Sequence, residues 1–267
     1  MFYLGGTNFP TTRDQLARAV TEGMATLLTL PSGRSVVNLC GEYPRFDTVT
    51  IDLTGAKLTA DRLPPEPKGT GQVQPGPSTA RLEVAGHPLY VRESPVELSL
   101  GANDARFDYD RDVTGRLVLL LKDAKDGAVT LTARKQDLDA LAMVAAREGA
   151  TEHGVQILET QLTLTQLNPR SVAAEIRVKG KKMFVTATLH LRGTLTIDDA
   201  LNAKISGLSI TGQGMLGEMV SAAIRPKLNE VQGRVFPLTA LSLGEVRLRD
   251  LRVEVGETMK LTAAFGS

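Results

Sequence analysis

Three aspartates at alternate positions are the residues of this 267-residue chain whose types and spacing come nearest to a metal site. Asp108, Asp110 and Asp112 are interleaved with Tyr109 and Arg111. A comb of carboxylates could attract calcium, which prefers oxygen ligands. The more ordinary interpretation, and the one we favour, is the solvated end of a strand.

Two further motifs could carry chemistry. Asp198 and Asp199 stand together after an apolar run and could pair for acid–base work or bind a cation, but such a pair is more often a turn or a helix cap. Gly212–Gly217 is glycine-rich and opens a predicted helix, where backbone amides can hold phosphate. Because no lysine or ribose-binding acid accompanies it, we favour a strand-to-helix turn.

Motifs of several enzyme classes are missing from the sequence. It contains no Gly-x-x-x-x-Gly-Lys-Ser/Thr, no Gly-x-Ser-x-Gly and no His-Glu-x-x-His. Its single cysteine, Cys40, and its histidines, His87, His153 and His190, are too scattered for a zinc cluster. We therefore predict no enzyme, no metal and no cofactor. Cys40 is expected to be a small buried hydrophobe, and His190 to lie on solvated surface.

A basic cluster is more suggestive. Arg177, Lys179, Lys181 and Lys182 crowd a predicted hairpin, and Phe184 follows on an otherwise polar parity. Such a tip can dock on anionic headgroups, at about 1 kcal/mol for each basic side chain near the surface. The last four of these residues are the predicted membrane-contact set, which implies peripheral contact with an anionic membrane. The alternative is an ordinary solvated turn.

Charge and composition narrow the function classes. Lys and Arg total 31 and Asp and Glu total 30, so a strongly basic nucleic-acid binder is not expected. Aromatic residues make up 4% and tryptophan is missing, which disfavours stacking platforms for bases or sugars. The apolar residues are mainly aliphatic, which suits a core and equally suits acyl chains.

The sequence leaves localisation open. No stretch approaches the roughly 18–20 apolar residues of a membrane span. The start, Met-Phe-Tyr-Leu-Gly-Gly, lacks the basic and apolar regions of a signal peptide. We expect a cytoplasmic protein if the chain is complete, and a periplasmic or cell-envelope protein if an export signal has been trimmed.

The longest periodic element runs over Met183–Ile197. Every second residue there is apolar or neutral, which predicts a strand with one dry and one wet face. A strand of this length is typical of a large, curved, one-sided antiparallel sheet. The dry-face residues are Met183, Val185, Ala187, Leu189, Leu191, Gly193, Leu195 and Ile197.

Three amphipathic helices are available to cover such a face. Thr12 and Gln15 form a capping-box pattern before a helix that ends at Pro31–Gly33. A second helix is predicted over Asp137–Arg147. A third covers Leu216–Gln232 and should kink at Pro226, which removes a backbone donor.

Strands dominate the rest of the chain, and no regular strand–helix alternation supports a Rossmann or TIM fold. We predict a turn at Gly101–Asp104, a Pro/Gly-rich flexible loop over 64–78, and one α+β domain over 1–267; the loop could instead mark a domain boundary. The helix-and-sheet order also suggests a loose internal duplication. The predicted strands are Ser35–Cys40, Thr48–Leu53, Ala80–Ala85, Val96–Leu100, Ala105–Tyr109, Arg116–Leu121, Val129–Ala133, Val155–Leu167, Val172–Val178, Met183–Ile197, Ala203–Ile210, Glu245–Val255 and Met259–Phe265.

The order of several motifs resembles the LmeA-like phospholipid-binding family over roughly Ala80–Phe265, with a weaker match over Thr12–Leu58. Each motif alone is unspecific, and their order carries the resemblance. The motifs are Gln136–Leu141, Gln161–Leu164, Leu191–Asp199, the helix through Pro226, and Val235–Leu238 before a last strand pair.

The resemblance implies a relative of the tubular lipid-binding (TULIP-like) superfamily, in which an elongated, strongly curved antiparallel sheet wraps around long amphipathic helices. Acyl chains lie between the sheet and a kinked helix, and members are typically exported, whereas this chain shows no export signal. It implies no catalytic residues. The apolar residues predicted to line the groove are Leu16, Val20, Met24, Met183, Val185, Leu189, Leu191, Leu195, Leu216, Met219, Val220 and Ile224.

We therefore expect a protein that binds or shuttles lipid, with a phospholipid or fatty-acyl ligand and no nucleic acid. The alternative is a structural or interaction protein of the bacterial envelope, with the dry face fully packed by its own helices or by a second copy in a homodimer. The third hypothesis is a hydrolase that uses scattered carboxylates. It would need acid and base side chains that come together in one site.

Overall fold

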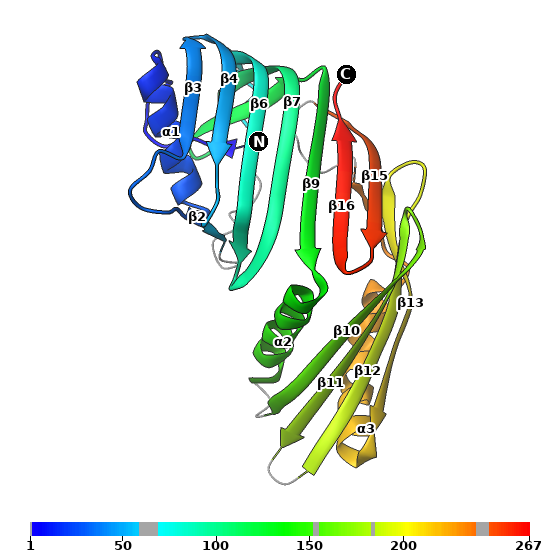
Figure 1. The fold of residues 1–267 in the computed structure, drawn as a ribbon. Coiled ribbons are helices and arrows are strands. Elements are labelled where there is room, and N and C mark those ends of the chain that lie inside the picture. The colour runs from blue at the N-terminus through cyan, green and yellow to red at the C-terminus, as the bar shows by residue number, and fades with distance from the viewer. Residues whose placement is uncertain (1, 59–68, 152–154, 183–184, 239–245) are drawn as a thin grey trace. The chain divides into compact units, whose positions relative to one another are not determined.

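The computed structural model describes residues 2–58, 69–151, 155–182, 185–238 and 246–267, which form two compact units (Figure 1). Unit 1 comprises Met1–Thr132, Thr239–Asp250 and Thr262–Ser267, and unit 2 comprises Ala133–Leu238 and Leu251–Leu261. Both consist mainly of strands in open, curved sheets with few helices, so the predicted α+β class is confirmed at this level. The single lipid-binding domain predicted over 1–267 stays a prediction.

The larger sheet, most of which lies in unit 1, has the strand order β15-β16-β9-β7-β6-β4-β3, with β1, β2, β5 and β8 paired beside this path. Its strands are β1 Phe2–Tyr3, β2 Leu28–Thr29, β3 Val37–Glu42, β4 Arg45–Asp52, β5 Lys57–Leu58, β6 Gln74–Val91, β7 Ser94–Arg111, β8 Leu117–Asp123, β9 Asp126–Arg134, β15 Leu248–Val255 and β16 Thr258–Phe265.

This sheet is mixed, which corrects the prediction of an antiparallel one. β6 pairs in parallel with both β4 and β5, whereas β3–β4, β6–β7, β7–β8 and β7–β9 are antiparallel. The predicted flexible loop is also shorter than expected: Gln74–Ser78 already belongs to β6, and 64–68 lie outside the described residues.

The predicted turn at Gly101–Asp104 does not reverse the chain, because β7 runs through it without a break. Its residues instead mark a change of partner. Asn103 is the last β7 residue paired with β9, opposite Asp126, and Arg106 is the first paired with β8, opposite Asp123. Asp104, between them, has φ 49°, a conformation that aspartate adopts more readily than most residues.

The first helix, α1 (Arg13–Ala25), begins as predicted. The Thr12 hydroxyl accepts a hydrogen bond from the Gln15 amide at 3.3 Å, and the Gln15 side chain accepts one from the Thr11 amide at 2.9 Å. The helix ends earlier than predicted, since Leu28 belongs to β2. The amide and hydroxyl of Thr26 both donate to the Gly23 carbonyl, which closes the last turn.

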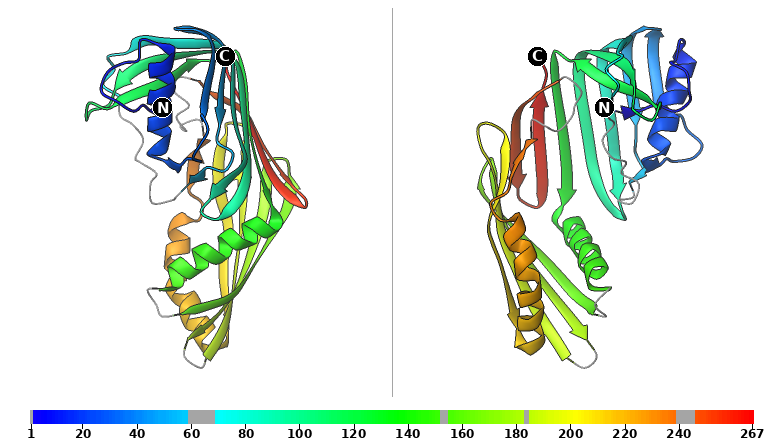
Figure 2. Two further views of the ribbon diagram at one scale, coloured as in Figure 1. Left: turned by 60° about the vertical axis from the view of Figure 1, so that its left-hand side comes forward. Right: turned by 180° about the vertical axis from the view of Figure 1, so that it is seen from behind.

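Unit 2 contains an antiparallel sheet in chain order, β10-β11-β12-β13-β14. Helix α2 (Lys135–Thr151) packs against β10, and α3 (Gly214–Val231) packs against β12 and β13 (Figure 2). Because this topology differs from that of the mixed sheet, the expected duplication does not extend to strand order. The strands are β10 Gln156–Asn168, β11 Ser171–Lys182, β12 Val185–Ile197, β13 Asn202–Gln213 and β14 Val235–Pro237.

The predicted dry face of β12 is only partly dry. Ala187 and Ile197 are buried, and Leu189 and Leu191 are half-buried. By contrast, Val185 is 53% and Leu195 is 38% exposed, so the prediction was wrong for both. Val185 is the first residue of the strand. Leu195 lies near the other end of the strand, beyond an irregularity in the β12–β13 pairing whose extra residue belongs to β13.

Candidate ligand-binding site beneath helix α1

A cavity of about 300 Å³ lies within unit 1, between α1 and the sheet. It is partly open, and every lining residue except Ser78 is apolar. The wall consists of Phe2, Leu16, Val20, Met24, Val37, Leu39, Phe46, Val49, Ile51, Pro77, Ser78, Leu82, Val84, Leu100, Phe107, Leu119 and Leu121. The structure therefore provides an apolar pocket without a charged side chain among these lining residues.

The helical wall of the pocket is a single stripe. Leu16, Val20 and Met24 follow one another at intervals of four residues, which places them on one face of α1. Leu16 and Val20 are buried, and Met24 is half-buried. All three were predicted to line a groove, and the structure brings them together in this pocket wall.

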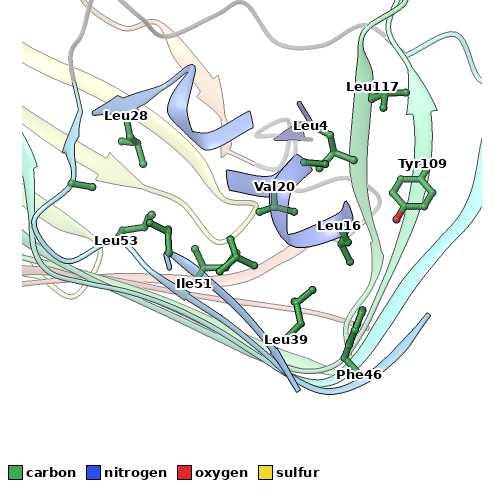
Figure 3. Close-up of a cluster of buried hydrophobic side chains, with 14 of the residues drawn as sticks. Leu4, Leu16, Val20, Leu28, Leu39, Phe46, Ile51, Leu53, Tyr109 and Leu117 are labelled. Atoms are coloured by element: carbon green, nitrogen blue, oxygen red, sulfur yellow. The ribbon is translucent and has the colours of Figure 1, made fainter. Parts of the chain in front are cut away.

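The opposite wall comes from strands that are distant in sequence. Val37 of β3 lies directly across from Ile51 of β4, and Leu39 lies across from Val49, so these side chains form neighbouring pairs on one face. Figure 3 shows Leu39 and Ile51 on the same side of the sheet as Leu16 and Val20 of α1. Sequence reasoning missed the sheet wall, although the alternation in β3 and β4 indicated its inward residues.

Part of the wall is less covered than the rest. Val84, Leu100, Phe107 and Leu121 line the pocket but are only partly buried, and they pack against a second cluster of buried residues that includes Leu82. α1 packs against β1, β2 and β3. A helix of 13 residues thus covers one part of the sheet face and leaves these aliphatic and aromatic side chains only partly buried.

Tyr109 carries a buried polar atom close to this pocket. It pairs across strands with Leu119, and its ring lies 5.3 Å from the ring of Phe9. Its hydroxyl is buried and has no hydrogen-bond partner among the described residues. Burial, together with the nearby Tyr43 hydroxyl, raises the pKa of Tyr109 far above its ordinary value. Tyr109 therefore remains a neutral donor and adds no charge to this region.

The other predicted groove residues lie in unit 2 and not in the wall of this pocket. Met183 lies outside the described residues, as does the side chain of Leu216. Met219 of α3 is 66% exposed. The other predicted groove residues lie on β12 and α3. Val185 and Leu195 are exposed, and the half-buried ones are Leu189, Leu191, Val220 and Ile224.

The aspartate comb proves to be structural, so the expectation of a solvated strand end was wrong. Asp108, Asp110 and Asp112 are 6%, 2% and 3% exposed. Asp108 pairs with Lys122 at 2.8 Å. Asp110 accepts hydrogen bonds from the Thr70 hydroxyl at 2.9 Å and the Gly71 amide at 3.1 Å, which fixes the segment before β6 to β7.

Asp112 fastens the first strand to the start of β8. It accepts hydrogen bonds from the Tyr3 hydroxyl at 3.1 Å and the Arg116 amide at 2.9 Å, and from both the amide and the hydroxyl of Thr114. Burial alone would raise the pKa of this carboxyl, but these hydrogen bonds outweigh burial and hold the pKa well below its usual range. Among the described residues, no group of three or more acidic, histidine or cysteine side chains could hold a metal ion.

The remaining motifs form turns. Asp198 accepts hydrogen bonds from the backbone and side-chain nitrogens of Asn202 at 2.8 and 3.0 Å, closing the β12–β13 turn as we favoured. Gly212 meets α3 closely: a Cβ there would stand 1.9 Å from the Gly217 carbonyl oxygen. Because Gly212 lies opposite Leu189, this contact also shows that the odd-numbered residues around Leu189 face α3.

Two single-residue expectations were wrong. Cys40 is exposed, because in β3 it alternates with the buried Leu39 and so takes the outward position. His190 is not simply solvated: its side chain is 22% exposed, and Nδ1 lies 3.5 Å from a carboxylate oxygen of Glu175 on the neighbouring strand. Its Nε2 is buried without a hydrogen-bond partner among the described residues.

The basic hairpin residues do not share one environment. Lys179 is half-buried and lies across from Glu159 of β10. Lys181 and Lys182 are exposed at the end of β11. Phe184 lies outside the described residues.

Comparison with known proteins adds no identification. No family model matches the chain, and no curated protein or solved structure matches it. The resemblance to the LmeA-like family therefore stays a prediction. None of the helices in the described part of the chain has the length and apolar character needed to cross a membrane.

Proposed function

We propose that this protein binds lipid and holds an acyl chain in the apolar pocket beneath α1. The observation that carries the proposal is the pocket itself, about 300 Å³ in volume and apolar throughout its wall except at Ser78. Apolar cavities of about 150 Å³ can bind benzene, and ligand pockets begin at about 300 Å³. Space of this kind suits a hydrocarbon ligand.

The volume limits how much of a chain fits. If a methylene group takes about the room of a water molecule, ~30 Å³, the pocket takes about ten carbons. Burying them at about 0.8 kcal/mol each contributes about 8 kcal/mol.

The wall also limits the ligand's charge. Burying an ion without a partner is very costly, and the lining residues carry no charge. The carboxylate of a fatty acid or the phosphate of a phospholipid would therefore stay at the opening, and the hydrocarbon alone would enter.

The proposal changes the helix expected to cover the ligand. The helix with internal proline, α3, was the predicted cover, but the pocket lies beneath α1. A TULIP-like arrangement, with chains held between a curved sheet and a helix, is part of the proposal and is supported by the curvature of the sheet and the position of α1. The alternative protein with a fully packed core would leave no such space in unit 1.

Native mass spectrometry of the purified protein, followed by organic extraction, tests the proposal directly. We expect co-purified acyl lipid, and calorimetric titration of the emptied protein with decanol should show a negative heat-capacity change. Val84→Phe, which fills the pocket, should abolish both signals. Val113→Phe is the matched control, since Val113 is 71% exposed and outside the wall. A protein without extractable lipid or decanol binding contradicts the proposal.

A further inference from the structure

One end of the unit 2 sheet combines exposed lysines with exposed aliphatic side chains. Lys181 and Lys182 end β11, and Val185 begins β12 directly across from Lys182. Val185 is 53% exposed, and Leu158, near the start of β10, is 43% exposed. All four residues therefore lie at the end of the sheet where β10 begins and β11 passes to β12.

Strand pairing explains why Leu158 projects from this end. Ile157 pairs with Gly180 and Glu159 pairs with Lys179, so Leu158 is the extra residue of a bulge. Ile157, in contrast, is buried. A single exposed leucine or valine is ordinary on a protein surface. Here two of them accompany two lysines on neighbouring strands.

Among the described residues of β10, β11 and β12 at this end, lysines outnumber acidic side chains. Lys181 lies across from Gln156 on one side and Thr186 on the other, and Lys182 lies across from Val185. Neither lysine has an acidic cross-strand partner among the residues that the structure describes. Lys179 differs, because it lies across from Glu159 and is half-buried. The exposed basic pair is thus Lys181 and Lys182.

We propose that this end of unit 2 docks on an anionic membrane surface, with Lys181 and Lys182 at the headgroup phosphates and Leu158 and Val185 in the interfacial region. Lysines beside exposed aliphatic groups fit such a surface on two counts, since it is negatively charged and accepts shallow apolar side chains. Lys179 is not part of the docking set. The inference does not depend on the pocket of unit 1, because no docking residue lines that pocket.

Co-sedimentation with vesicles tests this inference in the full chain. Wild-type protein should sediment with equimolar phosphatidylglycerol and phosphatidylcholine, and much less with phosphatidylcholine alone. Lys181→Ser with Lys182→Ser should lower the partition coefficient by about fivefold for each lysine. The binding should also disappear in about 1 M salt, where the Debye length is about 3 Å.

A charge-matched control lies in unit 1. Lys57 of β5 and Lys125, between β8 and β9, are both exposed. Lys57→Ser with Lys125→Ser removes the same charge and should leave sedimentation unchanged. Val185→Ser should weaken binding by a factor that salt does not alter.

Three outcomes overturn the inference. They are wild-type protein that ignores anionic vesicles, a lysine double variant that binds like wild type, and a control double variant that loses as much binding as the lysine variant. Thermal unfolding of each variant, compared with wild type, establishes that it is folded before its sedimentation is interpreted. Lipid extraction from the same variants keeps the two proposals separate, because loss of docking should leave the pocket's ligand content intact.

Discussion

The two units differ in how completely a helix and the sheet face beside it bury each other's side chains. In unit 1, α1 buries Leu16, Ala19 and Val20 in a cluster that extends over β3 and β4. In unit 2, none of the described side chains of α2 is fully buried, and α3 buries only Gly217 and Ser221 among its described positions. The difference shows that an alternating apolar strand specifies which face of the sheet can be buried. The packing of a helix against that face decides how much of it is buried.

Replacing one leucine in each unit by alanine should give the largest difference in unfolding free energy between the two units. Leu16→Ala removes a buried side chain next to the pocket and should cost about 2–5 kcal/mol of unfolding free energy. Leu191→Ala, at a half-buried position of β12, should cost about 1 kcal/mol. Urea denaturation followed by circular dichroism measures both values. Equal losses would mean that the two units are packed alike.

Acid should act on unit 1 through its buried carboxylates. Hydrogen bonds outweigh burial at Asp110 and Asp112 and lower the pKa of each. A lowered folded-state pKa stabilises the protein above the unfolded value, about 3.9, and that contribution is lost as the pH falls from there toward the folded-state pKa. Unfolding free energies measured between pH 5 and pH 2 should therefore decline.

Asp112→Asn provides the comparison for the acid effect. It should weaken the protein at pH 7, because it removes the carboxylate that holds Tyr3 and Arg116, and it should flatten the decline in acid. Asp198→Asn, in a turn of unit 2, is the control with an exposed side chain and should leave most of the decline in place. A wild-type slope that survives in Asp112→Asn would assign the acid effect to other groups.

Two tyrosines of unit 1 differ in whether the hydroxyl makes a hydrogen bond. The Tyr43 hydroxyl donates to the Pro10 carbonyl at 2.8 Å, so Tyr43→Phe should cost about 1 kcal/mol. Tyr109→Phe removes a buried hydroxyl without a partner among the described residues, and it should leave stability unchanged or raise it. Thermal unfolding compares the pair. A larger loss for Tyr109→Phe would show that its hydroxyl is bonded in solution.

The smallest expected effect concerns Cys40. Because it is exposed on β3, it should react with a thiol reagent in the folded protein at a rate near that of a free thiol. Cys40→Ser should change stability by less than about 0.5 kcal/mol. Protection of the thiol until unfolding would instead place it in the core, as its sequence context suggested.

Local sequence patterns predicted the elements whose causes are themselves local. The pattern at Thr12 and Gln15 predicted the start of α1, and alternating hydrophobicity predicted β10 to β13 as strands. The hairpin predicted between Val178 and Met183 was placed too early, because β11 runs on to Lys182. The same patterns located Leu16, Val20 and Met24 on one helix face. In each case the relevant partner lies within a few residues of the pattern that predicts it.

Features set by distant partners were not predictable in this way. The parallel pairing of β4 with β6 depends on where the chain returns, which neither strand encodes in its own periodicity. The burial of Asp110 depends on Thr70, which lies 40 residues away. Likewise, most of the pocket wall comes from separate strands, so the sequence indicated apolar faces but not which of them enclose space.

The change of partner at Asp104 makes β7 a fork in the sheet. One edge of this strand pairs first with β9 and then, beyond Asp104, with β8. Deleting one residue at the fork would leave Glu97–Asn103 in register with β9. Every later side chain of β7 would then point to the opposite face of the sheet. Phe107 and Tyr109 would then turn away from the pocket, and Asp108 and Asp110 would turn toward it. Deletions at this one point are therefore far less tolerable than deletions in a neighbouring turn, although its sequence reads as a turn.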